Sequence, residues 1–260
     1  MNHALQGLRR TFQALSYHDF RLFWIGQLIS LTGTWMQSIA QSWLVLELTR
    51  SSFVLGMVSA LGMLPVLFFA LPAGAIADGV DKRRLLMVTQ SAMMGLALIL
   101  AVLTSTGNVR VWQIVALAVL LGLANAFDQP GRQAFVIELV GREDLLNAVA
   151  LNSAAFNTAR ILGPALAGIL IGTLGIAACF YLNGLSFVAV IVGLGLIRTS
   201  FTPERPAAES IFEDMLDGLK YIRQDRRILT LIVLVGVFSI FGLPYLVLMP
   251  VVARSVLKCG

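Results

Sequence analysis

Long apolar runs alternate with short polar breaks along most of the chain. About 20 consecutive apolar residues are needed to cross ~30 Å of hydrocarbon as an α-helix. Seven runs come close to that length or exceed it, so the pattern predicts seven membrane-spanning helices. We place them at residues 22–47, 53–77, 86–105, 111–128, 146–172, 176–197 and 228–253.

The composition favours a chain that lies in a bilayer. Hydrophobic residues make up 58% of the 260 positions and charged residues only 13%, and the mean hydropathy is +0.84. A soluble domain has about 25% charged residues, so this chain has roughly half the usual number with which to cover a water-facing surface. The predicted fold class is therefore an all-α polytopic membrane protein.

Basic residues gather in the N-terminal tail, in the break after the second apolar run and in the long break 198–227. Lys and Arg concentrate on the cytoplasmic side of membrane proteins, so we expect a cytoplasmic N-terminus. Anionic lipids of the inner leaflet attract such bases. Membrane lipid therefore explains the formal net charge of +5, and no nucleic-acid partner is expected.

The break 198–227 is the longest polar stretch after the tail. Ser210 and Glu213 have the spacing of a helix capping box, and apolar residues then recur at helical spacing. We expect a short amphipathic helix that links two membrane domains on the inner surface. The predicted organisation is a cytoplasmic tail (1–21), a six-span bundle (22–197), a cytoplasmic linker (198–227) and the first span of a further bundle (228–260).

The break between the second and third spans reads GAIADGVDKRR, residues 74–84. A solvated turn with inward-facing bases explains Lys82 and Arg83, but it does not explain Gly74 and Asp78 at the end of the second span. A glycine permits close approach of helices. An aspartate there can cap or pair with the positive N-terminal end of a neighbouring helix.

This stretch resembles the loop 2–3 signature of the major facilitator superfamily, G-x-x-x-D-x-x-G-R-[RK], with Asp81 in place of the second glycine. Residues 130–168 resemble loop 4–5 and the fifth span of the enterobactin-exporter-like and macrolide-exporter-like branch. The opening SYHDFRLFWIGQLIS resembles the first span of that branch. The resemblance extends to about residue 257, whereas a full-length member has twelve spans. It therefore covers the N-terminal six-helix bundle and a seventh helix, with the C-terminal bundle largely missing.

The resemblance implies alternating access, in which two six-helix bundles rock about a central cavity. The loop 2–3 motif then latches the cytoplasmic face in the outward-open state. Asp78 would meet the end of a helix from the second bundle, beyond residue 260, while Lys82 and Arg83 would hold neighbouring acids.

Polar residues in the first span recur at spacings of three and four, which places them on one helix face. Such residues avoid lipid, so they either line a cavity or bond to neighbouring helices. The resemblance places this span at the cavity. The residues are Gln27, Ser30, Thr34, Gln37 and Gln41.

Two further polar groups, Asn125 and Asp128, lie near the inner end of the fourth span. We assign Asn125 to the cavity as well. Asp128 can bond Arg132 or cap the following turn.

Arg160 lies about 14 residues into the fifth span, or ~20 Å along a helix. At that depth an arginine is costly and needs a partner or water. Helix carbonyls or Asn side chains would make its role structural, whereas anion recognition or proton coupling would make it functional. The nearest candidate acids by sequence are Glu47 and Asp128.

The residues after Arg160 resemble the antiporter motif of the fifth span, whose core is G-P-x-x-G-G. Gly163, Pro164 and Gly168 match it, and Ala167 replaces one glycine. The same residues are suited to shaping a close helix crossing.

A membrane enzyme would need catalytic groups poised in one site. Both histidines, His3 and His18, lie in the N-terminal tail, and no apolar run contains paired carboxylates, a Cys–His pair or a phosphate-binding loop. The two cysteines have no metal-ligand spacing. We therefore expect a protein that is not an enzyme and that has neither a cofactor nor a metal.

The expected function is that of a secondary active transporter in the bacterial inner membrane. By resemblance it is a proton-coupled exporter of an amphipathic organic compound, such as a drug or a siderophore. Its expected partners are that small molecule, the proton, membrane lipid and the missing C-terminal bundle. The alternative is a truncated, non-transporting membrane fragment or an assembly subunit.

Overall fold

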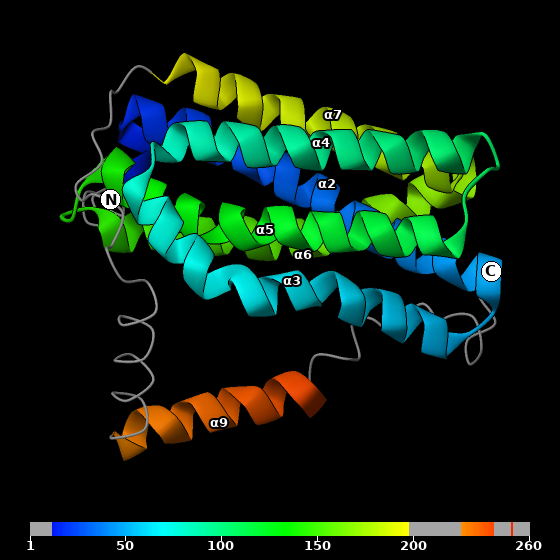
Figure 1. Ribbon diagram of the computed structural model, residues 1–260. Coiled ribbons are helices and arrows are strands. Elements are labelled where there is room, and N and C mark those ends of the chain that lie inside the picture. The colour runs from blue at the N-terminus through cyan, green and yellow to red at the C-terminus, as the bar shows by residue number, and fades with distance from the viewer. Residues whose placement is uncertain (1–11, 198–224, 242–250, 252–260) are drawn as a thin grey trace, which may run out of the picture.

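The computed structural model describes residues 12–197, 225–241 and 251 of the chain (Figure 1). Every element in this part is helical. The elements are η1 (Gln13–Ser16), α2 (His18–Thr49), α3 (Ser52–Gly79), α4 (Lys82–Ser105), α5 (Val111–Val140), α6 (Leu145–Leu174), α7 (Ile176–Leu196) and α9 (Arg226–Phe241).

Helices α2 to α7 run back and forth along one direction and form a six-helix bundle (Figure 1). Helix α2 packs against α6 and α7, α5 packs against α3 and α4, and α4 also packs against α7. Helices α5 and α6 touch only briefly, although they are consecutive in the chain. We call the end of the bundle with the α3–α4 and α5–α6 turns the basic end, because Lys82, Arg83, Arg84 and Arg142 lie there.

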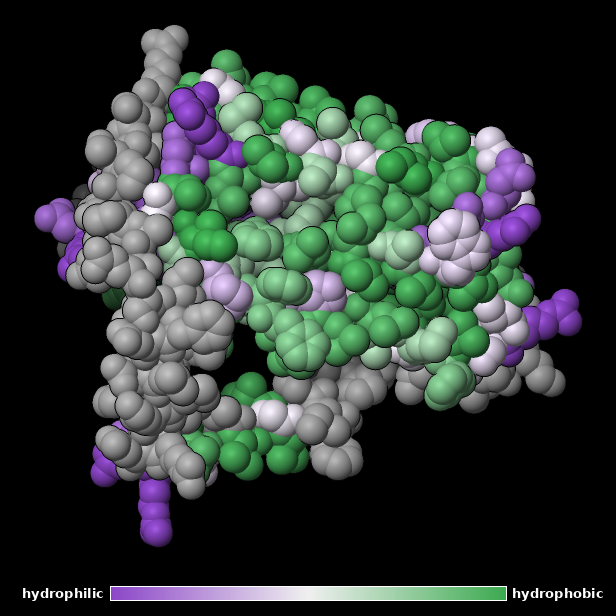
Figure 2. Space-filling view, in the orientation of Figure 1, coloured by the Kyte–Doolittle hydropathy of each residue, from purple (hydrophilic) through white to green (hydrophobic). Residues whose placement is uncertain are grey.

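Helices α3 to α7 are long and apolar enough to cross a membrane. Helix α2 has the length but does not share the apolar character, because glutamines, serines and threonines interrupt it. Helix α9, with 16 described residues, lies apart from the bundle (Figure 1). The visible face is largely hydrophobic, and strongly hydrophilic residues gather at the two ends of the bundle (Figure 2). Such a surface suits lipid rather than water.

Close helix packing in the bundle depends on glycines that accept a neighbour where a side chain would not fit. A Cβ atom on Gly33 of α2 would lie 2.5 Å from the Ser186 Oγ atom of α7. A Cβ atom on Gly122 of α5 would collide with the Gly62 carbonyl oxygen of α3. These contacts fix α2 on α7 and α5 on α3.

The structure moves two predicted helix boundaries. The fourth span was expected to end at residue 128 and loop 4–5 to follow, whereas α5 continues through Pro130 to Val140. Phe135 is fully buried there and packs edge-to-face on Phe23, with ring centroids 5.3 Å apart. This burial outweighs the one helix hydrogen bond that a proline removes. Similarly, α4 begins at Lys82 rather than at residue 86.

The N-terminal segment is fastened to the start of α6. The Ala14 N–H donates to the Asn147 Oδ1 atom over 2.9 Å, and the Tyr17 hydroxyl donates to the Asp144 Oδ2 atom over 2.8 Å. The hydrogen bond to Asp144 and the negative charge of that carboxylate raise the pKa of Tyr17. The predicted linker covers residues 198–227. All but its last three residues lie outside the part that the structure describes.

Candidate functional site

The loop 2–3 motif lies between the end of α3 and the start of α4, at the basic end. Asp81 caps α4 by accepting a hydrogen bond from the Arg84 N–H over 3.1 Å. Lys82 is buried, and its Nζ atom lies 2.7 Å from the Glu138 Oε1 atom of α5. Lys82 therefore holds a neighbouring acid, as the resemblance implies, and that acid belongs to the same bundle.

Arg83 differs from the expectation that it holds an acid. Its Nε atom donates to the Leu194 carbonyl over 2.6 Å and its Nη2 atom to the Gly195 carbonyl over 2.8 Å. The last carbonyls of a helix lack intrahelical partners and carry partial negative charge, which explains this contact with the end of α7. The two bases thus tie α4 to two other helices of the bundle.

Gly74 and Asp78 lie one turn apart on the same face of α3. Asp78 is exposed and has no hydrogen-bond or ion-pair partner among the residues that the structure describes. A Cβ atom built on Gly74 would meet nothing within 4 Å. The close approach expected at Gly74 is therefore not made inside the described bundle, and this face of α3 is open with respect to the residues that the structure describes.

A buried polar cluster joins α4 to α5 below the motif. Asp128 is 0% exposed and accepts hydrogen bonds from the Thr89 Oγ1 and Gln90 Nε2 atoms, each over 2.8 Å. It also forms an ion pair with Arg132, one of the two alternatives that the sequence left open. Thr89 and Gln90 were not predicted. Their signal was the polar stretch Thr89-Gln90-Ser91 in an otherwise apolar run.

The polar residues that form a row on α2 differ in burial. Gln27, Ser30 and Gln37 are buried. The Gln37 Oε1 atom accepts a hydrogen bond from the Asn183 Nδ2 atom of α7 over 2.7 Å, so Gln37 bonds to a neighbouring helix. Thr34 is exposed and Gln41 is half-buried.

Asn125 of α5 is half-buried. Its Nδ2 atom donates to the Leu121 carbonyl of the same helix over 2.9 Å. The Oδ1 atom of its side chain is left to accept other hydrogen bonds.

Arg160 lies on α6, 15 residues after its first residue, Leu145. It is exposed and has no hydrogen-bond or ion-pair partner in the described part of the chain. Neither acid considered from the sequence reaches it. Glu47 accepts a hydrogen bond from the Trp43 Nε1 atom over 3.0 Å, and Asp128 belongs to the buried cluster.

The glycines after Arg160 behave differently from one another. A Cβ atom on Gly163 would lie 2.9 Å from both the Met36 N atom and the Thr32 O atom, so α6 crosses α2 closely there. Pro164 is half-buried beside this crossing. Gly168 is exposed, with nothing within 4 Å of a built Cβ atom. The expected close crossing is therefore present at Gly163 and absent at Gly168 within the described bundle.

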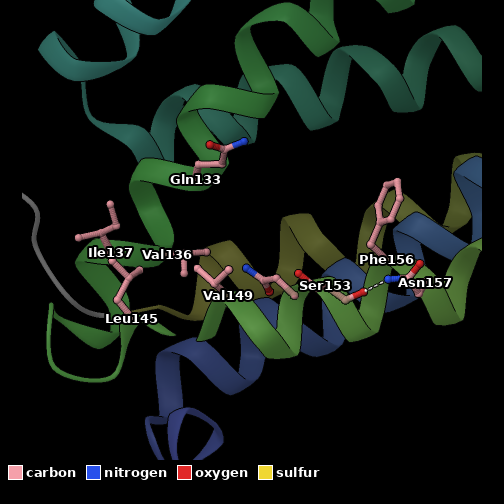
Figure 3. Close-up of a pocket in the computed structure, with 9 residues that line it drawn as sticks. Gln133, Val136, Ile137, Leu145, Val149, Ser153, Phe156 and Asn157 are labelled. Atoms are coloured by element: carbon pink, nitrogen blue, oxygen red, sulfur yellow. Dashed lines mark hydrogen bonds between the residues drawn. The ribbon is translucent and has the colours of Figure 1, made fainter. Parts of the chain in front are cut away.

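A pocket of about 570 Å³ lies between α5 and α6 near the basic end (Figure 3). We call it the amide pocket, because three of the side chains that line it are amides. The Asn157 Nδ2 atom donates to the Ser153 carbonyl over 2.8 Å. The sequence did not single out this pocket, although NSAAFN (residues 152–157) is unusually polar for a membrane helix. The lining residues are Gln133, Val136, Ile137, Leu145, Val149, Asn152, Ser153, Phe156 and Asn157.

Residues 9–260 match the protein family described as transmembrane secretion effector. The chain belongs to this family of major facilitator superfamily transporters. The resemblance stated from the loop 2–3 signature is thereby confirmed, as is the all-α membrane fold. Membership of a transporter family and five apolar helices together indicate a multi-pass membrane protein.

Three curated relatives illustrate the family. The chain is 29% identical over 239 residues to a staphyloferrin A transporter of Staphylococcus aureus, and it is 22% identical over 238 residues to macrolide efflux protein A of Streptococcus pyogenes. In both cases 91% of this chain and 59% of the relative are covered. It is also 29% identical over 198 residues to the multidrug efflux pump Tap of Mycolicibacterium fortuitum, where 73% of this chain and 48% of the relative are covered.

The chain thus spans between about half and three fifths of the length of the curated relatives it matches. No solved structure matches it.

Proposed function

We propose that this chain forms the N-terminal bundle of a secondary active exporter that works by alternating access. The proposed substrate is an amphipathic organic compound, a drug or a siderophore, and the proposed driving force is proton antiport. The membrane is the bacterial inner membrane, with the N-terminus and the basic end on the cytoplasmic side. The positions of the bases and the names of the relatives, which describe siderophore transport and drug efflux, support this proposal.

The observation that carries the proposal is the position of two unpaired charges. Asp78 at the end of α3 and Arg160 in the middle of α6 are both exposed, and neither has a partner among the described residues. Arg160 lies roughly 22 Å along its helix, a depth at which an unpaired charge is costly. Its counterpart therefore lies outside this bundle, and a second bundle or a bound substrate would supply it.

In the proposed cycle the two faces have different tasks. Asp78 meets the end of a helix from the second bundle when the cytoplasmic side closes, with Lys82 and Arg83 holding the loop in place. Thr34, Gln41 and Asn125 face the central cavity. Closure sequesters the substrate from one side before the other side opens.

Accumulation of substrate in everted membrane vesicles, where an exporter carries its substrate into the lumen, measures efflux activity and tests the gating role in the complete transporter. The panel contains a macrolide, a catecholate siderophore and a carboxylate siderophore. Asp78→Asn should lower the efflux rate of any exported compound at least about tenfold, since it removes one charged contact of the closed state. Glu143→Gln makes the same change of charge at the same end and should leave efflux unchanged. Normal efflux by Asp78→Asn would overturn the gating role.

The alternative, a non-transporting fragment or assembly subunit, makes a different prediction. The intact mass of the protein purified from its native host would then be close to the 28.1 kDa of this chain. A mass about one and a half times that value, as the lengths of the relatives imply, together with efflux that an ionophore abolishes, would favour a complete proton-coupled exporter.

A further inference from the structure

The amide pocket combines apolar and neutral polar groups in a way that suits an amphipathic molecule. Helix α6 contributes Asn152, Ser153 and Asn157, and α5 contributes Gln133, while aliphatic side chains and the Phe156 ring form the rest of the wall (Figure 3). None of the nine described residues that line it is charged. Amides and hydroxyls can donate and accept hydrogen bonds, so the pocket can hold hydroxyl, amide or ester groups on an apolar body.

Arg160 continues the row of α6 residues that line the pocket. It follows Phe156 by four residues and Asn157 by three, so it lies on the same helix face. Side chains on a helix lean toward its N-terminus, which directs the long Arg160 side chain back toward Phe156 and the pocket. The side chain is exposed and has no partner in the described part of the chain.

No described carboxylate of the bundle pairs with this guanidinium. Both carboxylates of α5 are already engaged, Asp128 with Arg132 and Glu138 with Lys82, and Asp78 lies at the basic end of α3. An anion supplied from outside the bundle is therefore the partner that Arg160 lacks.

We propose that the amide pocket and Arg160 form one binding site for an amphipathic organic anion. The apolar and neutral polar body of the molecule lies between α5 and α6, and its carboxylate or sulfonate binds the Arg160 guanidinium toward the middle of the membrane. This inference rests on the proposed export function and names the charge class of its substrate.

Two probes that share one body but differ in charge test the site. Anilinonaphthalenesulfonate is an amphipathic anion, and phenylnaphthylamine is the same aromatic amine without the sulfonate. Their dissociation constants are measured by fluorescence with the full chain in phosphatidylcholine nanodiscs, after subtraction of the signal from empty nanodiscs. Circular dichroism and gel filtration establish that each variant is folded.

Arg160→Gln should weaken binding of the anionic probe about tenfold and leave the neutral probe within about twofold, because only the anion loses a charge-assisted hydrogen bond. Arg160→Lys, which keeps the charge, should restore much of the anion affinity. Ser153→Trp fills the pocket and should weaken both probes. Arg50→Gln removes an exposed arginine at the opposite end of the bundle and should affect neither.

Two results would overturn the inference. One is an Arg160→Gln variant whose affinities for the two probes remain in the wild-type ratio. The other is a Ser153→Trp variant that binds both probes like the wild type. Either result could occur in a protein that still exports a substrate in the vesicle assay, so failure of this site is distinguishable from failure of the proposed function.

Discussion

Two sets of charged residues in the bundle differ in their surroundings. Lys82, Asp128, Arg132 and Glu138 lie between α4 and α5, each with a partner of opposite charge in the same bundle. Asp78 and Arg160 lie on the open sides of α3 and α6 and have no partner among the described residues. The first group stabilises one bundle. The second group indicates what the bundle meets, because a charge left unpaired in a membrane protein is costly unless something else neutralises it.

Among substitutions of the paired and unpaired charges, the one at Asp128 should lower the free energy of unfolding most. Asp128→Ala removes the acceptor for Thr89 and Gln90 and leaves Arg132 without its ion-pair partner. We expect the free energy of unfolding to fall by about 3–5 kcal/mol, as when one member of a buried ion pair is removed. Urea unfolding of the detergent-solubilised chain measures this change. A loss below about 1 kcal/mol would show that the cluster does not hold α4 and α5 together.

A smaller effect is expected at Lys82, whose partner Glu138 is 20% exposed at its side chain. Lys82→Met should lower the free energy of unfolding by about 2 kcal/mol, because it breaks one ion pair and leaves the Glu138 carboxylate, whose Oε2 atom is buried, without a partner, whereas Asp128→Ala removes three contacts. The double variant Lys82→Met/Glu138→Leu should recover part of the loss. If the two single effects simply add, the pair is not coupled and this prediction is wrong.

Arg83 should have a still smaller effect, since it bonds carbonyls rather than an acid. Arg83→Gln should cost about 1 kcal/mol through the lost hydrogen bonds to the end of α7. Hydrogen exchange at the last turn of α7 should increase, while exchange at its centre stays unchanged. Arg84→Gln, an exposed neighbour, is the matched control.

The smallest effect on stability is expected at Asp78. Asp78→Asn should change the free energy of unfolding by less than about 0.5 kcal/mol, because the side chain is exposed and has no hydrogen-bond or ion-pair partner among the described residues. Its effect belongs to the efflux assay instead. A large loss of stability in the isolated chain would reveal a partner for Asp78 within the bundle and would end the comparison between paired and unpaired charges.

The sequence predicts the existence of the helices well because an apolar run of about 20 residues is typical of a membrane-spanning helix. It predicts their ends less well. The extension of α5 beyond Pro130 depends on Phe135 packing against Phe23, more than a hundred residues earlier in the chain. A local pattern contains no information about that contact.

In the candidate site, too, local contacts could be predicted from the sequence and contacts between helices could not. The pair of Asp128 and Arg132 was one of two local alternatives, since residues four apart are neighbours on a helix. The partners of Lys82 and Gln37 lie on other helices and depend on how the bundle packs. The row on α2 was predicted as a row, but only packing decides that Gln37 is buried and Thr34 exposed.

The polar face of α2 has a consequence for how the protein is made. This helix is synthesised first, yet α6 and α7, against which most of its length packs, are synthesised last. Gln37 and its partner Asn183 are 146 residues apart. At ~5–20 residues per second, this separation corresponds to a delay on the order of ten seconds. Throughout that time a helix interrupted by glutamines, serines and threonines has to remain at the insertion machinery or at the lipid boundary, with the Gln37 amide unsatisfied. The time between synthesis of α2 and synthesis of α7 therefore limits how early the bundle can assemble.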